Sequence, residues 1–380
     1  MRIFISAGEP SGDIHGANLV RELKRRHPGV ECVGFGGPHM AGAGADLLYP
    51  LTDLAVMWIS RVLANVVTFL GLISRADRYF RHHRPDAVVL IDYPGFNWWM
   101  ARRAKAHGIP VFYFVPPQLW AWAGWRVKKM RRFVDHVLCS LPFEPAWYAE
   151  RGVQAEYVGH PFFDEVPEQK LDDDFMTRQR ADGRPIVGIL PGSRNQEIER
   201  NLSTQIRAAA LVQRARPDVR FLVACYRAAQ KKTVDEYLRR HPGLNIETYS
   251  GRTPEIIELA EAVISVSGSV SLELLQREKP SVIVYRVGRL DLKVGRFFMK
   301  AKYITLVNLL AERRLFPEYL SDRNECLSIA QDILGWLNVP SQRQEVVDAL
   351  RALKDRFAQP GACGRAAAFV LERLAAARAA

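Results

Sequence analysis

The chain has 380 residues, 48% of them hydrophobic, and a formal net charge of +12. This length and composition exclude a single small core, a disordered chain and a repetitive one, and they favour two globular domains. The positive charge favours an anionic partner, either nucleic acid, an anionic lipid surface or a phosphorylated substrate, unless it only reflects a basic proteome. The five scattered cysteines contain no CxxC pair, which argues against disulfides and zinc and fits a reducing compartment.

The first half of the chain alternates between short apolar runs and amphipathic segments. It opens with a predicted strand at 2–6, too short in its apolar run for a signal peptide, and a predicted helix at 12–26. The run at 87–91, Ala-Val-Val-Leu-Ile, is typical of a strand buried on both faces of a parallel sheet. Further strands are predicted at 31–35, 111–115 and 135–140, and helices at 97–107 and 127–133. We therefore expect a doubly wound α/β domain over residues 1–165.

A stretch rich in Pro, Asp and Gln, from 158 to about 183, is interpreted as a linker. The alternation restarts with a strand at 186–190 and continues to a strand at 281–285. It predicts a second α/β domain of similar size over residues 184–340. The Ala/Arg-rich segment 341–380 is predicted to be a helical tail.

Four loops follow predicted strands, where open parallel sheets bind their ligands. The first contains Gly8-Glu9-Pro10-Ser11-Gly12-Asp13-Ile14-His15. Ser11 or Asp13 alone is explained by helix capping, but the grouping of Glu9, Asp13 and His15 at one strand end favours a binding role. The pattern is not GxGxxG, so no dinucleotide is indicated.

In the second loop, Asp92 directly follows the buried run 87–91, while Pro94-Gly95 forms the turn and Asn97 is placed to cap the next helix. A partly desolvated carboxylate has a raised pKa, which makes Asp92 the best candidate for a general base. The alternative is that Asp92 only hydrogen-bonds the turn.

The third and fourth loops lie in the second half. Pro191-Gly192-Ser193-Arg194 leads from a strand into a helix, where free N–H groups and a guanidinium attract phosphate. Ser267-Gly268-Ser269 forms a similar turn, with Glu273 one helical turn later as a partner for ribose hydroxyls. Ordinary turns and N-caps are the alternatives. Together the two loops predict a site for a nucleotide diphosphate, and no metal-binding motif is present, so arginine and helix dipoles would neutralise the leaving diphosphate.

In combination these loops resemble lipid-A-disaccharide synthases, inverting glycosyltransferases of the GT-B class with two Rossmann-like domains facing a cleft. The motifs that carry the resemblance are Gly8-Glu9-Pro10-Ser11-Gly12-Asp13, Ile91-Asp92-Tyr93-Pro94 with Phe96-Asn97, Trp120-Ala121-Trp122, Pro142-Phe143-Glu144, Val158-Gly159-His160-Pro161, Leu190-Pro191-Gly192-Ser193-Arg194, Ser267-Gly268-Ser269 to Glu273, and Tyr303-Ile304 to Asn308-Leu309-Leu310. The family usually has Gly and then Glu where Trp58 and Arg61 stand, and Pro where Val307 stands.

The resemblance implies a reaction in which UDP-2,3-diacylglucosamine donates its sugar to 2,3-diacylglucosamine 1-phosphate (lipid X), giving a β-1,6-linked disaccharide and UDP. It implies no cofactor and no metal, with Asp92 as the base that takes the proton of the acceptor 6-hydroxyl. It places Glu9, Ser11, Asp13 and His15 on the acceptor side. The residues implied for UDP are Gly192, Ser193, Arg194, Ser267, Gly268, Ser269, Glu273 and Asn308.

The lack of a signal peptide and of a spanning run predicts a cytoplasmic protein, and the acylated, anionic substrates imply peripheral contact with the inner membrane. A monomer or a homodimer is expected. No apolar run approaches the ~20 residues that span a bilayer, but the segments 54–59 and 62–73, flanked by Arg61 and Arg75, fit an amphipathic surface element. Tryptophans from Trp98 to Trp125 beside a basic run fit the same surface, unless they are core residues next to a solvated face. A UDP-sugar 2-epimerase of similar architecture and a nucleic-acid-binding protein are the competing hypotheses.

Overall fold

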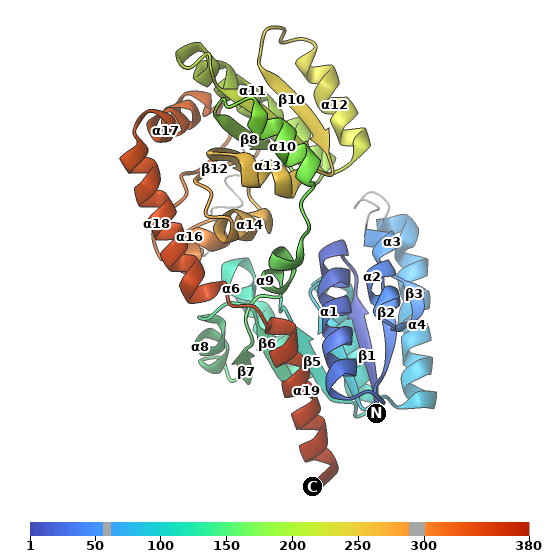
Figure 1. Ribbon diagram of the computed structural model, residues 1–380. Helices are drawn as coiled ribbons and strands as arrows, with labels where there is room; N and C mark the ends of the chain where they lie inside the picture. Colours follow the sequence, from blue (N-terminus) through green and yellow to red (C-terminus); the bar gives the residue numbers. More distant parts are fainter. Residues whose placement is uncertain (56–61, 289–300, 380) are drawn as a thin grey trace. The chain divides into compact units, whose positions relative to one another are not determined.

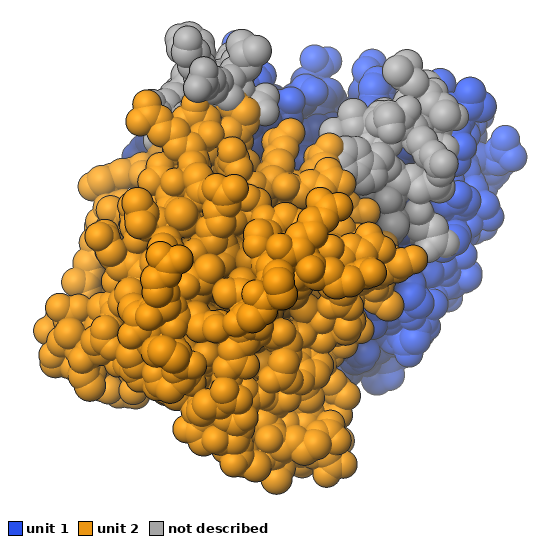
Figure 2. Space-filling model, turned by 90° about the horizontal axis from the view of Figure 1, so that it is seen from above, with its two compact units in different colours: residues 1–164, 359–380 blue, residues 165–358 orange. Residues whose placement is uncertain are grey.

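The computed structural model describes residues 1–55, 62–288 and 301–379. The chain forms two compact units (Figure 2): unit 1 comprises Met1–Asp164 with Gln359–Ala380, and unit 2 comprises Glu165–Ala358. Each described unit has a parallel β-sheet flanked by helices, which confirms the expected α/β, Rossmann-like fold class (Figure 1).

The sheet of unit 1 has the strand order β3-β2-β1-β4-β5-β6-β7, and its neighbouring strands pair in parallel. Its strands are β1 (Arg2–Ala7), β2 (Glu31–Gly36), β3 (Asp46–Pro50), β4 (Ala87–Ile91), β5 (Val111–Phe114), β6 (His136–Cys139) and β7 (Ala155–Tyr157). Its helices before the second unit are α1 (Pro10–Arg26), α2 (Pro38–Gly42), α3 (Thr52–Ala55), α4 (Val62–His83), α5 (Pro94–Ala106), α6 (Leu119–Trp122), the 3-10 turn η2 (Gly124–Arg126), α7 (Val127–Phe133), α8 (Glu144–Ala149) and α9 (Phe162–Glu165). The edge strands β3 and β7 were not predicted, because they are short and only partly buried and lack a clear apolar run.

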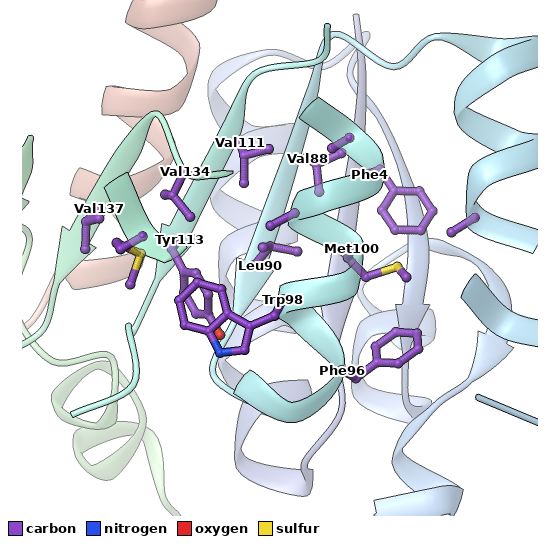
Figure 3. Close-up of a cluster of buried hydrophobic side chains, with 14 of the residues drawn as sticks. Phe4, Val88, Leu90, Phe96, Trp98, Met100, Val111, Tyr113, Val134 and Val137 are labelled. Carbon is purple, nitrogen blue, oxygen red and sulfur yellow. The ribbon is translucent and has the colours of Figure 1, made fainter. Parts of the chain in front are cut away.

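Alternating side chains of the central strands supply two cores, one on each face of the sheet. Phe4, Val88 and Leu90 face one way and pack under α5, where Trp98 and Met100 cover them (Figure 3). Their neighbours in sequence on β1 and β4 face the opposite core, which α1 and α19 (Ala362–Ala379) cover. A strand buried on both faces needs a continuous apolar run, which explains the composition of β4.

The sheet of unit 2 has the order β10-β9-β8-β11-β12-β13. Its strands are β8 (Ile186–Leu190), β9 (Arg220–Cys225), β10 (Ile246–Ser250), β11 (Ala262–Val266), β12 (Ser281–Arg286) and β13 (Glu318–Ser321). The helical elements described around it are η3 (Val166–Glu168), α10 (Asp173–Ala181), α11 (Asn195–Ala215), α12 (Ala228–Leu238), α13 (Thr253–Leu259), α14 (Val270–Gln276), α16 (Leu306–Ala311), α17 (Cys326–Asn338) and α18 (Pro340–Phe357).

Two segments are organised differently from the domain boundaries expected from sequence. The segment 158–183 contains α9, η3 and α10, and α10 packs against α13 within unit 2. The segment 341–380 is divided, because α18 belongs to unit 2 whereas α19 belongs to unit 1 and packs against α1 (Figure 1). Asp164 anchors the start of α19 by accepting hydrogen bonds from the N–H groups of Gly361 (2.5 Å), Ala362 (3.0 Å) and Cys363 (2.8 Å).

Candidate active site

The four loops singled out by sequence lie at the two places where the strand order of a sheet reverses. In unit 1, β1 pairs with β4, and the strands continue outward from this pair to β3 on one side and β7 on the other. In unit 2, β8 pairs with β11 in the same way. Such a reversal opens a crevice at the carboxyl ends of the two central strands, and ligands of doubly wound sheets bind there. Each unit therefore brings one pair of the predicted loops together.

Asp92 follows β4 directly and adopts a left-handed backbone conformation with φ +43°. Tyr93 does the same, with φ +47°, although both residues carry side chains that disfavour it. Burial raises the pKa of the Asp92 carboxyl, while a hydrogen bond from the Tyr93 backbone and the charge of His15 oppose the rise. A carboxylate with a raised pKa is a more effective proton acceptor near neutral pH, which fits the predicted general base.

Asn97 does not cap α5 as expected, because the helix begins at Pro94 and has Tyr93 at its N-cap. Its side-chain amide instead donates to the carbonyl oxygens of Asp92 (2.7 Å) and Ile91 (3.1 Å). The hydroxyl of Ser6 on β1 donates to the amide oxygen of Asn97 (2.7 Å). The fully buried side chain of Asn97 thus ties the loop after β4 to the neighbouring strand β1.

In the first predicted loop, Asp13 is engaged by the backbone of the next helix. Its buried carboxylate accepts N–H hydrogen bonds from Gly37 (2.8 Å), His39 (2.9 Å) and Met40 (3.0 Å), which fixes the start of α2. A negative charge at a helix start is stabilising, so Asp13 supports the fold, and its assignment to the acceptor side stays a prediction.

The other acceptor-side candidates are arranged differently. Ser11 is exposed and Glu9 is partly exposed, at the N-cap of α1. His15 is buried, and its ring centroid lies 6.1 Å from that of His160, whose pKa burial and the His15 charge lower to about 3. Gly8 must lack a side chain, because a Cβ there would lie 2.0 Å from the ring of Tyr93. The first two loops are thus packed directly against each other.

In unit 2, the 191–194 turn leads from β8 into α11. Ser193 and Arg194 are exposed, and Arg194 keeps 71% of its side chain accessible to solvent. The carboxylate of Glu197 accepts hydrogen bonds from the N–H groups of Ser193 (3.0 Å) and Arg194 (3.2 Å). Gly192 has φ +123°, which favours glycine. The turn thus presents a solvent-exposed guanidinium, 3.6 Å from a carboxylate oxygen of Glu197, at the start of a long helix.

The 267–269 turn follows β11. Gly268 and Ser269 are exposed, and a Cβ added at Gly268 would meet nothing within 4 Å. Glu273, in contrast, is buried, and its carboxylate is bound by the guanidinium of Arg277 (3.2 Å). Burial raises the pKa of Glu273, and Arg277 opposes that rise. The turn is displayed to a ligand, whereas one oxygen of Glu273 is already engaged.

Asn308 is also engaged by backbone groups. It is fully buried, and its amide oxygen accepts N–H hydrogen bonds from Leu315 and Phe316 (both 2.8 Å). Its amide nitrogen donates to the carbonyl oxygen of Phe316 (2.8 Å). Asn308 therefore holds the chain between α16 and β13, and its assignment to the UDP side stays a prediction.

Sequence reasoning missed two glutamines that shape the site of unit 2. Gln205 on α11 is fully buried and donates to the carbonyl oxygens of Leu190 (3.2 Å) and Ile264 (3.5 Å), so it bridges β8 and β11. Gln230 on α12 donates to the carbonyl oxygen of Ser193 (2.8 Å) and accepts from the N–H group of Arg227 (3.1 Å). Nothing local in sequence distinguishes them from other helical glutamines.

Glu144, quoted only as part of a motif, joins two further loops at the carboxyl edge of unit 1. It is fully buried and accepts from the indole N–H of Trp120 (3.0 Å) and from the N–H groups of Ser140 (3.1 Å) and Leu141 (2.9 Å). Burial raises its pKa to about 7, against the opposing effect of these hydrogen bonds. Within residues 1–55, 62–288 and 301–379, no group of three or more His, Cys, Asp or Glu side chains is placed to hold a metal ion.

Comparison with known proteins decides between the competing hypotheses. The family model described as lipid-A-disaccharide synthetase matches residues 3–371. Proteins named lipid-A-disaccharide synthase from Anaeromyxobacter sp. (strain K) and Myxococcus xanthus are each 35% identical to the chain, over 370 and 376 residues. These alignments cover 97% and 98% of this chain and 97% of each relative.

The chain belongs to the lipid-A-disaccharide synthetase family. Membership confirms the resemblance seen in the motifs and makes the chain an enzyme, a glycosyltransferase of lipid A biosynthesis.

Solved structures show how widely the fold of this family is shared. The UDP-GlcNAc 2-epimerase of Neisseria meningitidis superposes with a TM-score of 0.64 at 13% identity, covering 98% of this chain and 99% of that one. MurG of Acinetobacter baumannii superposes with a TM-score of 0.60 at 15% identity, with the same coverage. At such identities only the fold is shared, so the epimerase hypothesis is left with structural similarity alone.

Two positions at which the sequence departs from the family, Trp58 and Arg61, lie outside the described residues. The third, Val307, is buried in α16. Of the predicted surface segments, 54–59 is described only as far as residue 55, and Val67 and Leu70 on α4 are exposed.

The tryptophans of unit 1 divide into two groups. Trp98 is buried and Trp120 is hydrogen-bonded to Glu144, so these two belong to the fold. Trp99, Trp122 and Trp125 are exposed, and the guanidinium of Arg126 lies 5.1 Å and 5.8 Å from the ring centroids of Trp122 and Trp125. None of the helices in the described residues is long and apolar enough to cross a bilayer.

Proposed function

We propose that Asp92 is the general base with which this enzyme transfers the sugar of UDP-2,3-diacylglucosamine to the 6-hydroxyl of lipid X. The oxygen of that hydroxyl attacks the anomeric carbon, its proton passes to the Asp92 carboxylate, and UDP leaves with the bonding electron pair. The observation that supports this assignment is the position of Asp92: a partly buried carboxylate at the strand-order reversal of unit 1.

Unit 2 is proposed to bind UDP through its own strand-order reversal. The exposed Arg194 guanidinium would neutralise the diphosphate, and the 267–269 turn would supply hydroxyl and N–H groups. Glu273 and Asn308 would contribute by holding neighbouring backbone, because both side chains are buried. Glu9, Ser11 and His15 remain candidates for the acceptor side, in the loop that packs on the Asp92 loop.

The direct test uses the full chain with both lipid substrates in detergent and measures the disaccharide by mass spectrometry. Asp92→Asn should lower kcat by about 10²–10⁴-fold, as expected for loss of a positioned base, with UDP affinity unchanged. Near-normal turnover of this variant would remove Asp92 from the reaction. Turnover of UDP-GlcNAc to its 2-epimer without an acceptor would instead support epimerase activity.

We also infer that the enzyme works at the cytoplasmic face of the inner membrane, bound through unit 1. The surface that supports this inference combines the exposed Trp122 and Trp125 with Arg126 and the basic helix α7. Val67 and Leu70 on α4 are further exposed apolar side chains of unit 1. Tryptophan and basic side chains are enriched where proteins meet anionic lipid headgroups.

Flotation with vesicles of phosphatidylethanolamine and phosphatidylglycerol tests this inference. The Trp122→Ala/Trp125→Ala variant should bind several-fold less protein to vesicles, and added salt should weaken binding of the unmodified chain. Leu327→Ala, which removes an exposed apolar side chain from unit 2, is the matched control and should float normally. Equal flotation of all three proteins would contradict a membrane surface at these tryptophans.

A further inference from the structure

The backbone of Asp92 is held in an unfavourable conformation. Asp92 and Tyr93 are consecutive non-glycine residues with positive φ, and such strain persists only where surrounding contacts enforce it. The direction in which the Asp92 carboxylate points depends on this backbone conformation. The groups that enforce the conformation therefore control the candidate base.

Two side chains bind the carbonyl oxygen of Asp92. The hydroxyl of Tyr113, on the adjacent strand β5, donates to it at 2.7 Å, and the amide of Asn97 donates at the same distance. Asn97 is also bound to Ile91 and Ser6, so its loss would disturb several contacts. The hydroxyl of Tyr113 donates to the carbonyl oxygen of Asp92, and the side chain of Asn97 is its other hydrogen-bonding neighbour.

The rest of Tyr113 is fixed by packing. It is fully buried, and its ring centroid lies 5.8 Å from that of Trp98, which covers it (Figure 3). A buried ring on a central strand cannot follow a moving loop, so the hydroxyl is a fixed reference point for the backbone of Asp92.

We propose that Tyr113 is a positioning residue of the reaction: its hydroxyl holds the Asp92 carbonyl, and with it the left-handed backbone that aims the catalytic carboxylate. This proposal rests on the proposed role of Asp92 as base. Tyr113 touches neither substrate nor the reacting atoms in this scheme and acts through Asp92 alone.

The chain offers a matched pair of substitutions. Tyr113→Phe removes the hydroxyl and keeps the ring. Tyr148→Phe does the same at another fully buried tyrosine in the same core, whose hydroxyl has no hydrogen-bond partner among the described residues. Both variants therefore share the packing effect of deleting a buried hydroxyl. Only Tyr113→Phe also removes the hydrogen bond to the carbonyl oxygen of Asp92.

We expect Tyr113→Phe to lower kcat about 5–30-fold, the effect of one lost hydrogen bond on transition-state geometry, with KM and UDP affinity within about twofold of the unmodified enzyme. Tyr148→Phe should retain normal kcat. The acidic limb of the kcat–pH profile should also move to lower pH in Tyr113→Phe, because a carboxylate released from its partly desolvated position returns toward its ordinary pKa.

The titratable groups around Asp92 that bear on this profile are His15 on α1, Tyr93 beside it and Tyr113 itself, while Glu9 faces Tyr93. Asn97→Ala removes the other hydrogen bond to the same carbonyl and should move the limb in the same direction. Because both side chains bind one atom, the losses in kcat from Tyr113→Phe and Asn97→Ala should be non-additive in the double variant.

Three results would overturn the proposal: equal kcat in Tyr113→Phe and Tyr148→Phe, an unmoved acidic limb, or additive losses with Asn97→Ala. The failure of the proposed base is distinguishable, because it appears as an active Asp92→Asn variant whatever Tyr113→Phe does. An inactive Asp92→Asn with a fully active Tyr113→Phe would leave the base in place and remove the positioning role.

Discussion

The carboxylate of Glu197 lies 3.0 Å from the backbone nitrogen of Ser193 and accepts its hydrogen bond. The same oxygen accepts from Arg194, so the protein supplies its own anion to the N–H groups of the 191–194 turn. A diphosphate at this turn would therefore lie beside a negative charge and depend chiefly on the guanidinium of Arg194, which is 3.6 Å from the other oxygen of Glu197.

Glu197→Gln should bind UDP more tightly than the unmodified enzyme. The amide oxygen still accepts from the turn, while the negative charge that repels phosphate is gone, so we expect a gain of about 1 kcal/mol, or roughly fivefold, in low salt. Isothermal titration with UDP measures it. Glu197→Ala loses the same charge but also the hydrogen bonds that hold the turn, so its gain in UDP affinity should be smaller than that of Glu197→Gln. A Gln variant that binds UDP no more tightly than the unmodified enzyme would contradict this account.

Arg194→Ala should weaken UDP binding by about 1.5–3 kcal/mol, roughly 10- to 150-fold, because a charge-assisted contact to phosphate is lost. Arg214→Ala removes an equally basic, exposed side chain from the last turn of the same helix and should bind UDP normally. If both variants lost the same UDP affinity, the loss would be caused by the lower net charge and not by a contact at the 191–194 turn.

Gly192→Ala should destabilise unit 2 by about 1–3 kcal/mol. Its φ of +123° disfavours any Cβ, and an added one would lie 2.5 Å from the Cβ of Glu197. Denaturant unfolding is the measurement, and Gly268→Ala, where an added Cβ meets open space, is the control. Equal destabilisation by both substitutions would show that the Glu197 contact is not the cause.

Glu144 should make stability fall with rising pH. Burial raises its folded pKa to about 7 from the ordinary 4.5, so the folded state binds the proton more tightly than the unfolded state between these values. The unfolding free energy therefore decreases as pH rises from about 4.5 to about 7.

Glu144→Gln does not titrate, so the stability of the unmodified enzyme relative to this variant should decline across that range. Thermal unfolding of both proteins at several pH values measures the difference. Glu150→Gln, at the exposed end of the same helix, should follow the unmodified enzyme. Curves that stay parallel for Glu144→Gln would show that this carboxyl is not the source of the pH dependence.

Asp164→Ala should loosen α19. The Asp164 carboxylate binds three N–H groups at the start of this helix, and loss of such a cap costs about 0.5–2 kcal/mol. Hydrogen exchange should rise in the first turns of α19, while Glu372→Ala, an exposed change on the same helix, should leave exchange unchanged. Protection that survives in Asp164→Ala would place the anchoring of α19 in its apolar contacts alone.

Much of the fold was predictable because its signals are local. The apolar runs of β4, β8 and β11 are continuous, as strands covered on both faces require. The polar loops that follow them were recognised for the same reason, since a parallel strand delivers its next residues to the carboxyl edge of the sheet. Asp92 and Arg194 were found in this way.

The tertiary structure alone decided which of the polar candidates face outward. Asp13 and Asn308 have side chains of the kind that bind ligands, yet both accept hydrogen bonds from backbone N–H groups. Asp13 accepts from Gly37, which is distant in sequence, and Asn308 accepts from Leu315, in the turn that follows α16. Conversely, Ser6 and Tyr113 carry no sequence signal and reach the Asp92 loop from other strands. Strand order places them there, and strand order depends on long-range pairing that hydrophobic periodicity does not encode.

The sequence by itself therefore determined the two α/β units, the four loops and the family, because each is written in contiguous residues. The strained backbone of Asp92, the pairing of β1 with β4, and the return of α19 to unit 1 were decided only by the tertiary structure. The physical reason is that a buried hydrogen bond or core contact is favourable only once packing has excluded water from both partners, and those partners come from separate parts of the chain.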